Sequence, residues 1–228
     1  MLAELEHGPL EVIGRLVEAS NATFLVTLAS GRQAIYKPIR GERPLDDFPD
    51  GTLANRERAA YLLSAATGWR IVPPTVLREG PLGRGMVQAF VEVDEAVDVI
   101  ELILAPDPRL RRIALFDALA NNADRKGGHL LPVTGGHTHA VDHGVCFAVA
   151  AKLRTVLWAW RGQPLDDDEL AVVESVAAAL DAELGLALGE LLSPTEVAAT
   201  RRRARALLRS RRFPQPDPSR PALPWPPY

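Results

Sequence analysis

The sequence predicts an α+β protein of two lobes, the first rich in strands and the second in helices. Three observations support this prediction. Over roughly the first ninety residues, short runs of branched apolar residues alternate with turn residues, as in strands. From about residue 97 the apolar residues recur at helical spacing. Between these helices, near residues 127–136, two Gly-Gly pairs mark a loop and a hairpin.

The strands expected in the first lobe cover 10–17, 23–29 and 32–39, and two more fall within 71–77 and 85–93. One helix is expected at 52–68, with Leu53, Ala60 and Leu63 towards one side and Gly68 as its stop. We therefore expect a small antiparallel sheet with one helix, and we assign residues 1–92 to this lobe.

The second lobe is assigned to residues 93–212. Helices are expected at 109–122, 148–159, 167–184 and 194–210, and short strands near 129–133 and 139–143. The last helix begins at a capping box, with Ser193 at the cap, Pro194 at the first position and Glu196 at the third.

The proline-rich tail, 213–228, is expected to lack regular secondary structure. Its Trp225 and Tyr228 could pack on the domain or bind a partner. A strand-rich lobe, one helix and a helical lobe with a polar hairpin together form the layout of a protein-kinase-like fold.

Bulk properties point to the cytoplasm. The single cysteine, Cys146, excludes an internal disulfide, the N-terminus lacks a signal-peptide pattern, and no apolar run is long enough to span a membrane. The net charge is −3, yet residues 201–212 carry seven arginines and no acid. This segment could contact an anionic membrane surface, or it could be a solvated helix face. We expect no nucleic-acid partner.

The stretch 135–147 contains His137, His139 and His143, which first suggest a metal-dependent hydrolase. The familiar ligand run is H-x-H-x-D-H, and here one extra residue separates His139 from Asp142. On a strand, one residue turns every later side chain to the other face, so these ligands would not converge. The hydrolase is therefore the third and weakest reading.

Candidates for phosphoryl transfer occur in order along the chain. Lys37 stands in an apolar strand, where an unpaired ammonium is costly to bury, and Glu57 of the next helix could pair with it. Asp124 follows a helix end, and the hairpin 130–141 would bring Asp142 back beside it. In the protein-kinase signature a metal-binding asparagine comes five positions after the catalytic aspartate, and here that position is His129.

These segments resemble the catalytic and metal-binding segments of the phosphatidylinositol 3-/4-kinase family, above all the type II 4-kinases and their bacterial relatives. The similarity spans about residues 12–160, and its motif residues in this chain are Asp117, Asn122, Asp124, Arg125, His129, Leu130, Leu131, Val141, Asp142, Gly144 and Phe147. The resemblance implies a kinase that uses ATP with Mg²⁺ or Mn²⁺.

By this resemblance Asp124 would be catalytic, serving the acceptor hydroxyl, and Asp142 and His129 would bind the metal. Lys37 would hold the α- and β-phosphates, with Glu57 orienting it. Arg125 is grouped with the catalytic residues, since it could hold a phosphate or brace Asp124. Asp117, on an amphipathic helix, is expected to cap the helix or pair with Arg125 rather than touch substrate.

Two further sets of nucleotide contacts follow from the same resemblance. Ser20, Asn21 and Thr23 would form the turn that covers the phosphates. The backbone around Gln88, Phe90 and Val91 would meet adenine.

Two departures from the family pattern limit this reading. Imidazole at His129 is a poorer Mg²⁺ ligand than an amide oxygen, which favours a softer ion such as Mn²⁺. The turn 20–23 also lacks glycine. The function predicted is ATP-dependent transfer of the γ-phosphate to a lipid, protein or small alcohol. The alternative is a nucleotide-binding pseudokinase or regulatory module without turnover.

Overall fold

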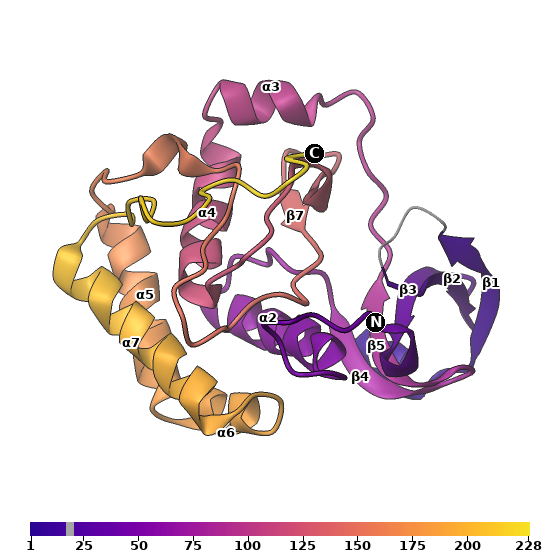
Figure 1. Cartoon of the computed structure of the whole chain (residues 1–228). Helices are drawn as coiled ribbons and strands as arrows, with labels where there is room; N and C mark the ends of the chain where they lie inside the picture. The colour runs from indigo at the N-terminus through magenta and orange to yellow at the C-terminus, as the bar shows by residue number, and fades with distance from the viewer. Residues whose placement is uncertain (17–20) are drawn as a thin grey trace.

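The computed structural model describes residues 1–16 and 21–228 and has two lobes (Figure 1). The N-terminal lobe is a five-stranded antiparallel sheet in the order β1-β2-β3-β5-β4. Its strands are β1 (Leu10–Leu16), β2 (Thr23–Leu28), β3 (Gln33–Pro38), β4 (Thr75–Gly80) and β5 (Gly83–Ala89). The α+β class and the two-lobed arrangement predicted from the sequence are confirmed.

The outer face of the sheet packs beneath a short helix that the sequence analysis did not predict, α1 (Leu2–His7). Leu5 of α1 is fully buried in the small core of this lobe together with Ala34 and Tyr36 of β3. Since side chains alternate along a strand, Ile35 and Lys37 of β3 face the other side. This alternation directs Lys37 towards the C-terminal lobe.

Helix α2 (Leu53–Thr67) lies between the sheet and the helical lobe (Figure 1). It ends at Gly68, whose φ of 70° is the left-handed conformation that glycine adopts most easily. Its buried residues Ala59, Ala60 and Leu63 join the main core. Because α2 also contacts β4 and β5, it can present side chains to both lobes.

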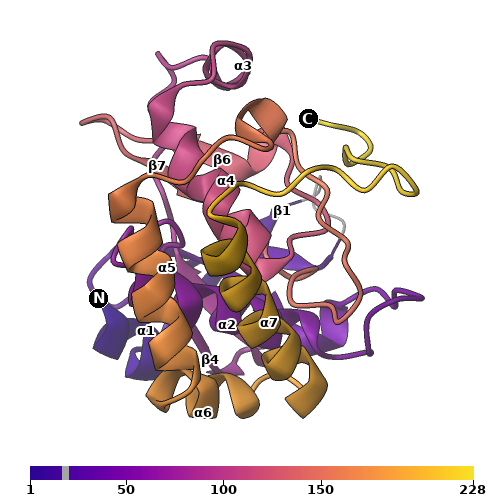
Figure 2. The ribbon, with the colours of Figure 1, turned by 90° about the vertical axis from the view of Figure 1, so that its left-hand side faces the viewer.

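The C-terminal lobe contains α3 (Val99–Leu104), α4 (Pro108–Ala120), α5 (Asp167–Leu180), α6 (Glu183–Gly189) and α7 (Pro194–Ser210). Figure 2 shows α5 and α7 side by side in front of α4, with α6 between their ends. The hairpin of β6 (Leu130–Pro132) and β7 (Thr138–Ala140) is also present. The predicted capping box of α7 is confirmed, since the Ser193 side chain accepts from the Glu196 N–H and Glu196 accepts from the Ser193 N–H.

One predicted helix is wrong. Residues 148–157 form no helix, and only Trp158–Trp160 make a short 3₁₀ turn. The backbone of this stretch bonds to the loop after α4 instead: Arg154 donates to the carbonyl of Asn122 at 2.9 Å and accepts from the N–H of Arg125 at 3.0 Å. The helix predicted at 167–184 is also divided, because α5 ends at Leu180 and α6 follows after a turn.

The tail beyond Phe213 has no helix or strand, as predicted, and it packs on the C-terminal lobe. Gly127 donates to the carbonyl of Pro227 at 2.9 Å, and the ring of Tyr228 covers Gly127. Trp225 remains 88% exposed. Among the residues described, no helix is both long and apolar enough to cross a membrane. The boundaries predicted for the lobes, at 92 and 212, stay predictions.

Candidate active site

The ammonium group of Lys37 meets two carboxylates between the lobes. Its Nζ donates to Oε1 of Glu57 at 2.8 Å and to Oδ1 of Asp142 at 3.0 Å. Although burial opposes it, the charges of Asp142 and Glu57 raise the pKa of Lys37 above its ordinary value, so the ammonium stays charged. Three elements far apart in the chain, namely β3, α2 and the loop after β7, thus converge on one point.

Two adjacent residues of α2, Arg56 and Glu57, point in different directions and fix the helix in place. Glu57 is 2% exposed and uses both oxygens, because Oε1 accepts from Lys37 and Oε2 accepts from the backbone N–H of His143 at 2.9 Å. Arg56 donates from Nη2 to Oε1 of Glu196 at 2.6 Å and from Nη1 to the carbonyl of Cys146 at 2.7 Å. Glu57 therefore holds Lys37 from a rigid support.

Asp142 is the carboxylate that opens to solvent, with a side chain 44% exposed. Its φ of 60° is a left-handed conformation uncommon outside glycine, and such strain is found at functional sites. The Lys37 ammonium holds the pKa of Asp142 well below its usual range, against the opposing effect of burial. Asp142 is therefore ionised at neutral pH.

His129 is next to Asp142, with Nε2 3.4 Å from Oδ2 of the carboxylate. Burial lowers the pKa of His129 to about 4, so the imidazole is neutral at neutral pH, and its Nδ1 accepts from the backbone N–H of Lys126 at 3.5 Å. The other nitrogen, Nε2, offers a lone pair to a cation only in the tautomer that gives up this bond. A carboxylate oxygen and a neutral imidazole nitrogen form a mixed ligand pair that suits Mn²⁺ better than the harder Mg²⁺. These two residues fit a divalent cation whose other ligands come from elsewhere.

Asp124 lies in the loop after α4, where its backbone N–H donates to Oδ1 of Asn122 at 2.9 Å. Its side chain is 35% exposed, and Nζ of Lys126 is 3.5 Å from its Oδ2. Burial, together with the nearby charge of Asp142, raises the pKa of Asp124 above its ordinary value. A carboxylate with a raised pKa is a better proton acceptor than an ordinary aspartate.

Next to Lys37, Glu57 and Asp142 lies a sealed cluster of Asp117, Arg125 and His143, all 0% exposed. Arg125 donates to Asp117 from Nε at 3.0 Å and from Nη2 at 3.0 Å, and to the carbonyl of Val141 from Nη1 at 2.7 Å. The pairing expected for Asp117 is therefore present. The grouping of Arg125 with the catalytic residues is corrected, because a fully buried guanidinium cannot reach a phosphate in the cleft.

The position of His143 completes this cluster. Its Nε2 is 2.7 Å from Nη2 of Arg125, and burial followed by the Arg125 charge holds the pKa of His143 well below its ordinary value. Because arginine only donates, Nε2 must accept, which assigns the ring proton to Nδ1. Arg125 thus joins the end of α4 to the segment that carries Asp142, and it fixes the loop after α4 in which Asp124 lies.

The phosphate-covering turn is described in part. Ser20 lies outside the described residues. Asn21 accepts from the backbone N–H of Arg43 through its Oδ1 at 2.9 Å, and Thr23 donates from Oγ1 to the carbonyl of Asn21 at 3.2 Å. Phe24 pairs with Tyr36 across β2 and β3, which places Thr23 beside Lys37. The end of this turn therefore adjoins the candidate site, and the phosphate-binding role of its residues stays a prediction.

The predicted adenine contacts fall into two groups. Gln88 lies inside β5, paired with Ile35 of β3 and Thr75 of β4, and its Nε2 donates to Oγ1 of Thr75 at 2.8 Å. Gln88 is thus held within the sheet, and the adenine contact expected of its backbone stays a prediction. Phe90 and Val91 lie just beyond β5, where the chain leaves the sheet for the second lobe, and their role stays a prediction.

The three histidines of the hydrolase reading do not converge. His137 and His139 contact the backbone carbonyls of Arg70 and Ile71 at 3.0 and 3.2 Å, whereas His143 is buried in the sealed cluster. Across residues 1–16 and 21–228, no three His, Cys, Asp or Glu side chains are placed to hold a metal by themselves. The hydrolase reading is therefore wrong in its geometry.

Lys126 and Arg154 were missed by the sequence analysis. The signal for Lys126 was its position two residues after Asp124, in a chain with only three lysines. Arg154 left no local signal, because the segment 148–159 was expected to be a helix. Its backbone bonds to Asn122 and Arg125 join it to the loop after α4 that carries Asp124.

Comparison with solved structures defines the class of protein. Hydra Fam20 with sugar superposes with a TM-score of 0.57 at 14% identity, over 92% of this chain and 86% of that one. The Golgi casein kinase with Mn/ADP bound gives 0.55 at 17%, over 92% and 74%. The Helicobacter pylori proinflammatory kinase CtkA gives 0.53 at 12%, over 92% and 94%. The chain therefore has a kinase-like fold, as predicted.

Comparison with known sequences shows the family of the chain. The chain is 44% identical to Protein Rv2133c of Mycobacterium tuberculosis over 99% of its own length and 95% of that protein, and it belongs to the same family. It is 26% identical to phosphatidylinositol 4-kinase gamma 4 of Oryza sativa subsp. japonica, over 85% of this chain but 41% of that protein. No family model matches the chain.

Proposed function

We propose that this chain is an ATP-dependent phosphotransferase that moves the γ-phosphate to a hydroxyl group. The observation that carries the proposal is the position of Lys37 Nζ, 2.8 Å from Glu57 and 3.0 Å from Asp142. A phosphoryl-transfer site needs a fixed cation for the phosphates and an ionised carboxylate for the metal, and these three residues supply both.

In this proposal each side chain has one task. Lys37, oriented by Glu57, binds the α- and β-phosphates as a point charge. Asp142 and His129 would hold a divalent cation, which would neutralise charge on the phosphate oxygens. Arg125, from the sealed cluster, fixes the loop that carries Asp124.

Asp124 orients the acceptor hydroxyl and takes its proton. The acceptor oxygen forms a bond to the γ-phosphorus, the bond from that phosphorus to the bridging oxygen breaks, and ADP leaves with the electron pair. The proton moves from the acceptor to the Asp124 carboxylate, whose raised pKa suits this transfer.

The acceptor we propose is a lipid headgroup, a protein or a small alcohol, with the inositol-lipid reading supported by the resemblance to phosphatidylinositol 4-kinase gamma 4. The arginine segment 201–212 supports membrane contact less than its charge suggests. Arg201 and Arg203 donate to the carbonyls of Leu180 and Leu119, and Arg205 pairs with Asp181. A membrane contact of this helix stays a prediction.

The second candidate is a nucleotide-binding regulatory module without turnover. His129 favours it, because an imidazole stands where the related kinases have an amide ligand. Both candidates bind ATP, and only the first transfers phosphate. They therefore differ in whether Asp124 matters, since a module that only binds nucleotide has no use for a proton acceptor.

The test measures ATP affinity and the transfer of γ-labelled phosphate, with Mg²⁺ or Mn²⁺, into the lipid, protein and small-molecule fractions of a cell extract. Wild type is expected to label one fraction. Asp124→Asn should keep ATP affinity and lose transfer by about a hundredfold, whereas Lys37→Met should lose both. The matched control is Asp46→Asn, at an exposed position. ATP binding without transfer in wild type would establish the regulatory module.

A further inference from the structure

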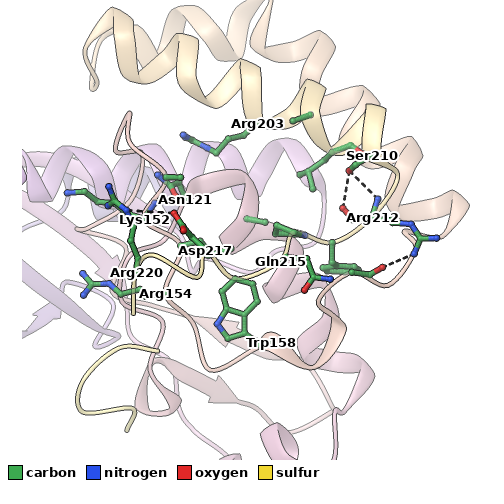
Figure 3. Close-up of a pocket in the computed structure, with 18 of the residues that line it drawn as sticks. Asn121, Lys152, Arg154, Trp158, Arg203, Ser210, Arg212, Gln215, Asp217 and Arg220 are labelled. Atoms are coloured by element: carbon green, nitrogen blue, oxygen red, sulfur yellow. Dashed lines mark hydrogen bonds and ion pairs between the residues drawn. The ribbon is translucent and has the colours of Figure 1, made fainter. Parts of the chain in front are cut away.

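A cavity of about 910 Å³ lies in the C-terminal lobe, on the side where the tail leaves the end of α7 (Figure 3). Its walls come from α4, the segment 151–154, α7 and the tail segment 212–221, and we call it the tail cavity. Lys37, Glu57, Asp142 and His129 are not among its lining residues. It is therefore a different site from the cleft between the lobes.

The tail forms a fixed wall of this cavity. At one end, Phe213 donates its N–H to the carbonyl of Gln163 at 3.0 Å. At the other end, the carbonyl of Ala222 accepts from Nε1 of Trp158 at 2.9 Å. The proline-rich stretch between these two anchors needs no helix or strand to keep its course, because both of its ends are tied to the lobe.

The lining has an excess of positive charge. The basic residues are Lys152, Arg154, Arg203, Arg212 and Arg220, and the acidic ones are Asp47 and Asp217. Five cations and two carboxylates leave a balance of +3, although the whole chain carries −3. The carboxylates are engaged by Lys152 and Arg220. Among the described residues, the other three arginines have no carboxylate within 4.0 Å.

Arg203 is the most constrained of these cations. Its Nε, Nη1 and Nη2 donate to the carbonyls of Leu119 at 2.9 Å and Ala148 at 3.2 Å and to Oγ1 of Thr200 at 2.8 Å, all neutral acceptors. Burial lowers the pKa of Arg203 to about 10. Of its five N–H groups, two therefore remain for another acceptor, and a desolvated guanidinium gains most from an anion.

Apolar groups face the same space. Figure 3 shows Trp158 across the cavity from Arg203, with Lys152, Arg154 and Arg220 grouped at one end. Leu153, Leu207 and Phe213 also line the cavity. Arginines that only face solvent would not need apolar side chains beside them. A cavity with an apolar wall and a positively charged end suits a ligand that has an apolar part and an anionic part.

We propose that the tail cavity binds an organic phosphate, a molecule with a phosphate monoester on an apolar body. The phosphate lies against Arg203 and Arg154, and the apolar body lies against Trp158 and Leu207. This proposal does not depend on phosphoryl transfer in the cleft. The ligand is nevertheless close to the catalytic loop, because the backbone of Arg154 bonds to Asn122 and Arg125 on either side of Asp124.

The test is calorimetric titration of the full chain with three probes, with Mn²⁺ and a non-hydrolysable ATP analogue filling the cleft. The probes are dihexanoyl phosphatidic acid, inorganic phosphate and dihexanoylglycerol. We expect the phosphatidic acid to bind at least about tenfold more tightly than inorganic phosphate, and the uncharged lipid not to bind. Equal affinity for inorganic phosphate would show a site for free phosphate and contradict the proposal.

Two variants test whether phosphatidic acid binds in the tail cavity. Arg203→Met should weaken phosphatidic acid binding by at least about tenfold. The matched control is Arg202→Met, since Arg202 is exposed, next to Arg203 and outside the cavity lining. Ala206→Trp fills the cavity without removing a charge and should also abolish binding, which covers the case in which Arg203→Met does not fold. The wild-type titration is repeated without the ATP analogue. No binding to wild type, equal affinity in Arg203→Met and Arg202→Met, or phosphatidic acid binding that is seen only without the analogue would overturn the proposal.

Discussion

Two charged clusters lie next to each other: the cleft cluster of Lys37, Glu57 and Asp142 and the sealed cluster of Asp117, Arg125 and His143. They differ in exposure to solvent, and this difference indicates which cluster can bind a ligand and which stabilises the fold. Both combine one strong cation with carboxylate partners at about 3 Å. The sealed cluster is 0% exposed, whereas Asp142 in the cleft is 44% exposed. A buried ion pair can only hold structure together, while a pair open on one side can exchange a partner for a ligand.

The two clusters are joined at one place. Oε2 of Glu57 accepts from the backbone N–H of His143, and Oε1 accepts from Lys37. Lys37 and Glu57 are therefore held in place through a contact with the sealed cluster. We expect changes in the sealed cluster to lower the free energy of unfolding, and changes at the open side of the cleft to lower activity alone.

The largest effect on stability is expected from Asp117→Asn. Asp117 accepts from Nε and Nη2 of Arg125 and from Nδ2 of Asn122, so the change leaves a fully buried guanidinium without its counter-charge. Breaking a buried pair on one side costs about 3–5 kcal/mol. Urea denaturation measures this loss, and a change below about 1 kcal/mol would mean that the sealed cluster does not support the fold.

Glu57→Gln should have an intermediate effect on both properties, because Glu57 belongs to the cleft cluster and also accepts from the backbone N–H of His143 in the sealed cluster. The amide keeps the shape of the side chain but loses the charge that faces Lys37. We expect the free energy of unfolding to fall by about 1–3 kcal/mol and phosphate transfer to fall by about tenfold or more. Urea denaturation and transfer assays on the same preparation measure the two effects. If only the free energy of unfolding or only the transfer rate changed, the link between the clusters would be refuted.

The smallest effect is expected from His129→Asn. An amide oxygen suits Mg²⁺ better than an imidazole nitrogen does, so the ratio of Mg²⁺-supported to Mn²⁺-supported transfer should rise severalfold. The free energy of unfolding should change by less than about 1 kcal/mol, since the His129 side chain contacts the open side of the cleft. Rates measured with each metal check this, and an unchanged ratio would exclude His129 as a metal ligand.

Sequence reasoning located the cleft cluster well because its residues are distinctive in type. A lysine in an apolar strand and an aspartate in an Asp-x-Gly segment can be recognised without coordinates. The assignment of Arg125 failed because the motif around Asp124 does not report burial, and Arg125 is buried by the later segment that contains His143. Local patterns therefore identified the charged groups but not which of them face solvent.

The irregular segment 148–157 shows the other limit. Its apolar and alanine-rich sequence favours a helix locally, yet the backbone of Arg154 is bonded to Asn122 and Arg125. Tertiary hydrogen bonds thus outweigh a weak helix propensity. The tail cavity was beyond sequence reasoning for the same reason, since the positions of Arg154 and Arg203 around it depend on that segment and on the anchored tail.

The central claim is that the cleft cluster is a working phosphoryl-transfer site, and Asp142→Asn tests it most directly. The measurement is transfer of γ-labelled phosphate from ATP with Mn²⁺, together with the urea denaturation midpoint, for wild type and this variant. We predict that Asp142→Asn loses at least about a hundredfold of the transfer rate, with its midpoint close to that of wild type. A variant as active as wild type, or a wild type that transfers nothing, would contradict the claim.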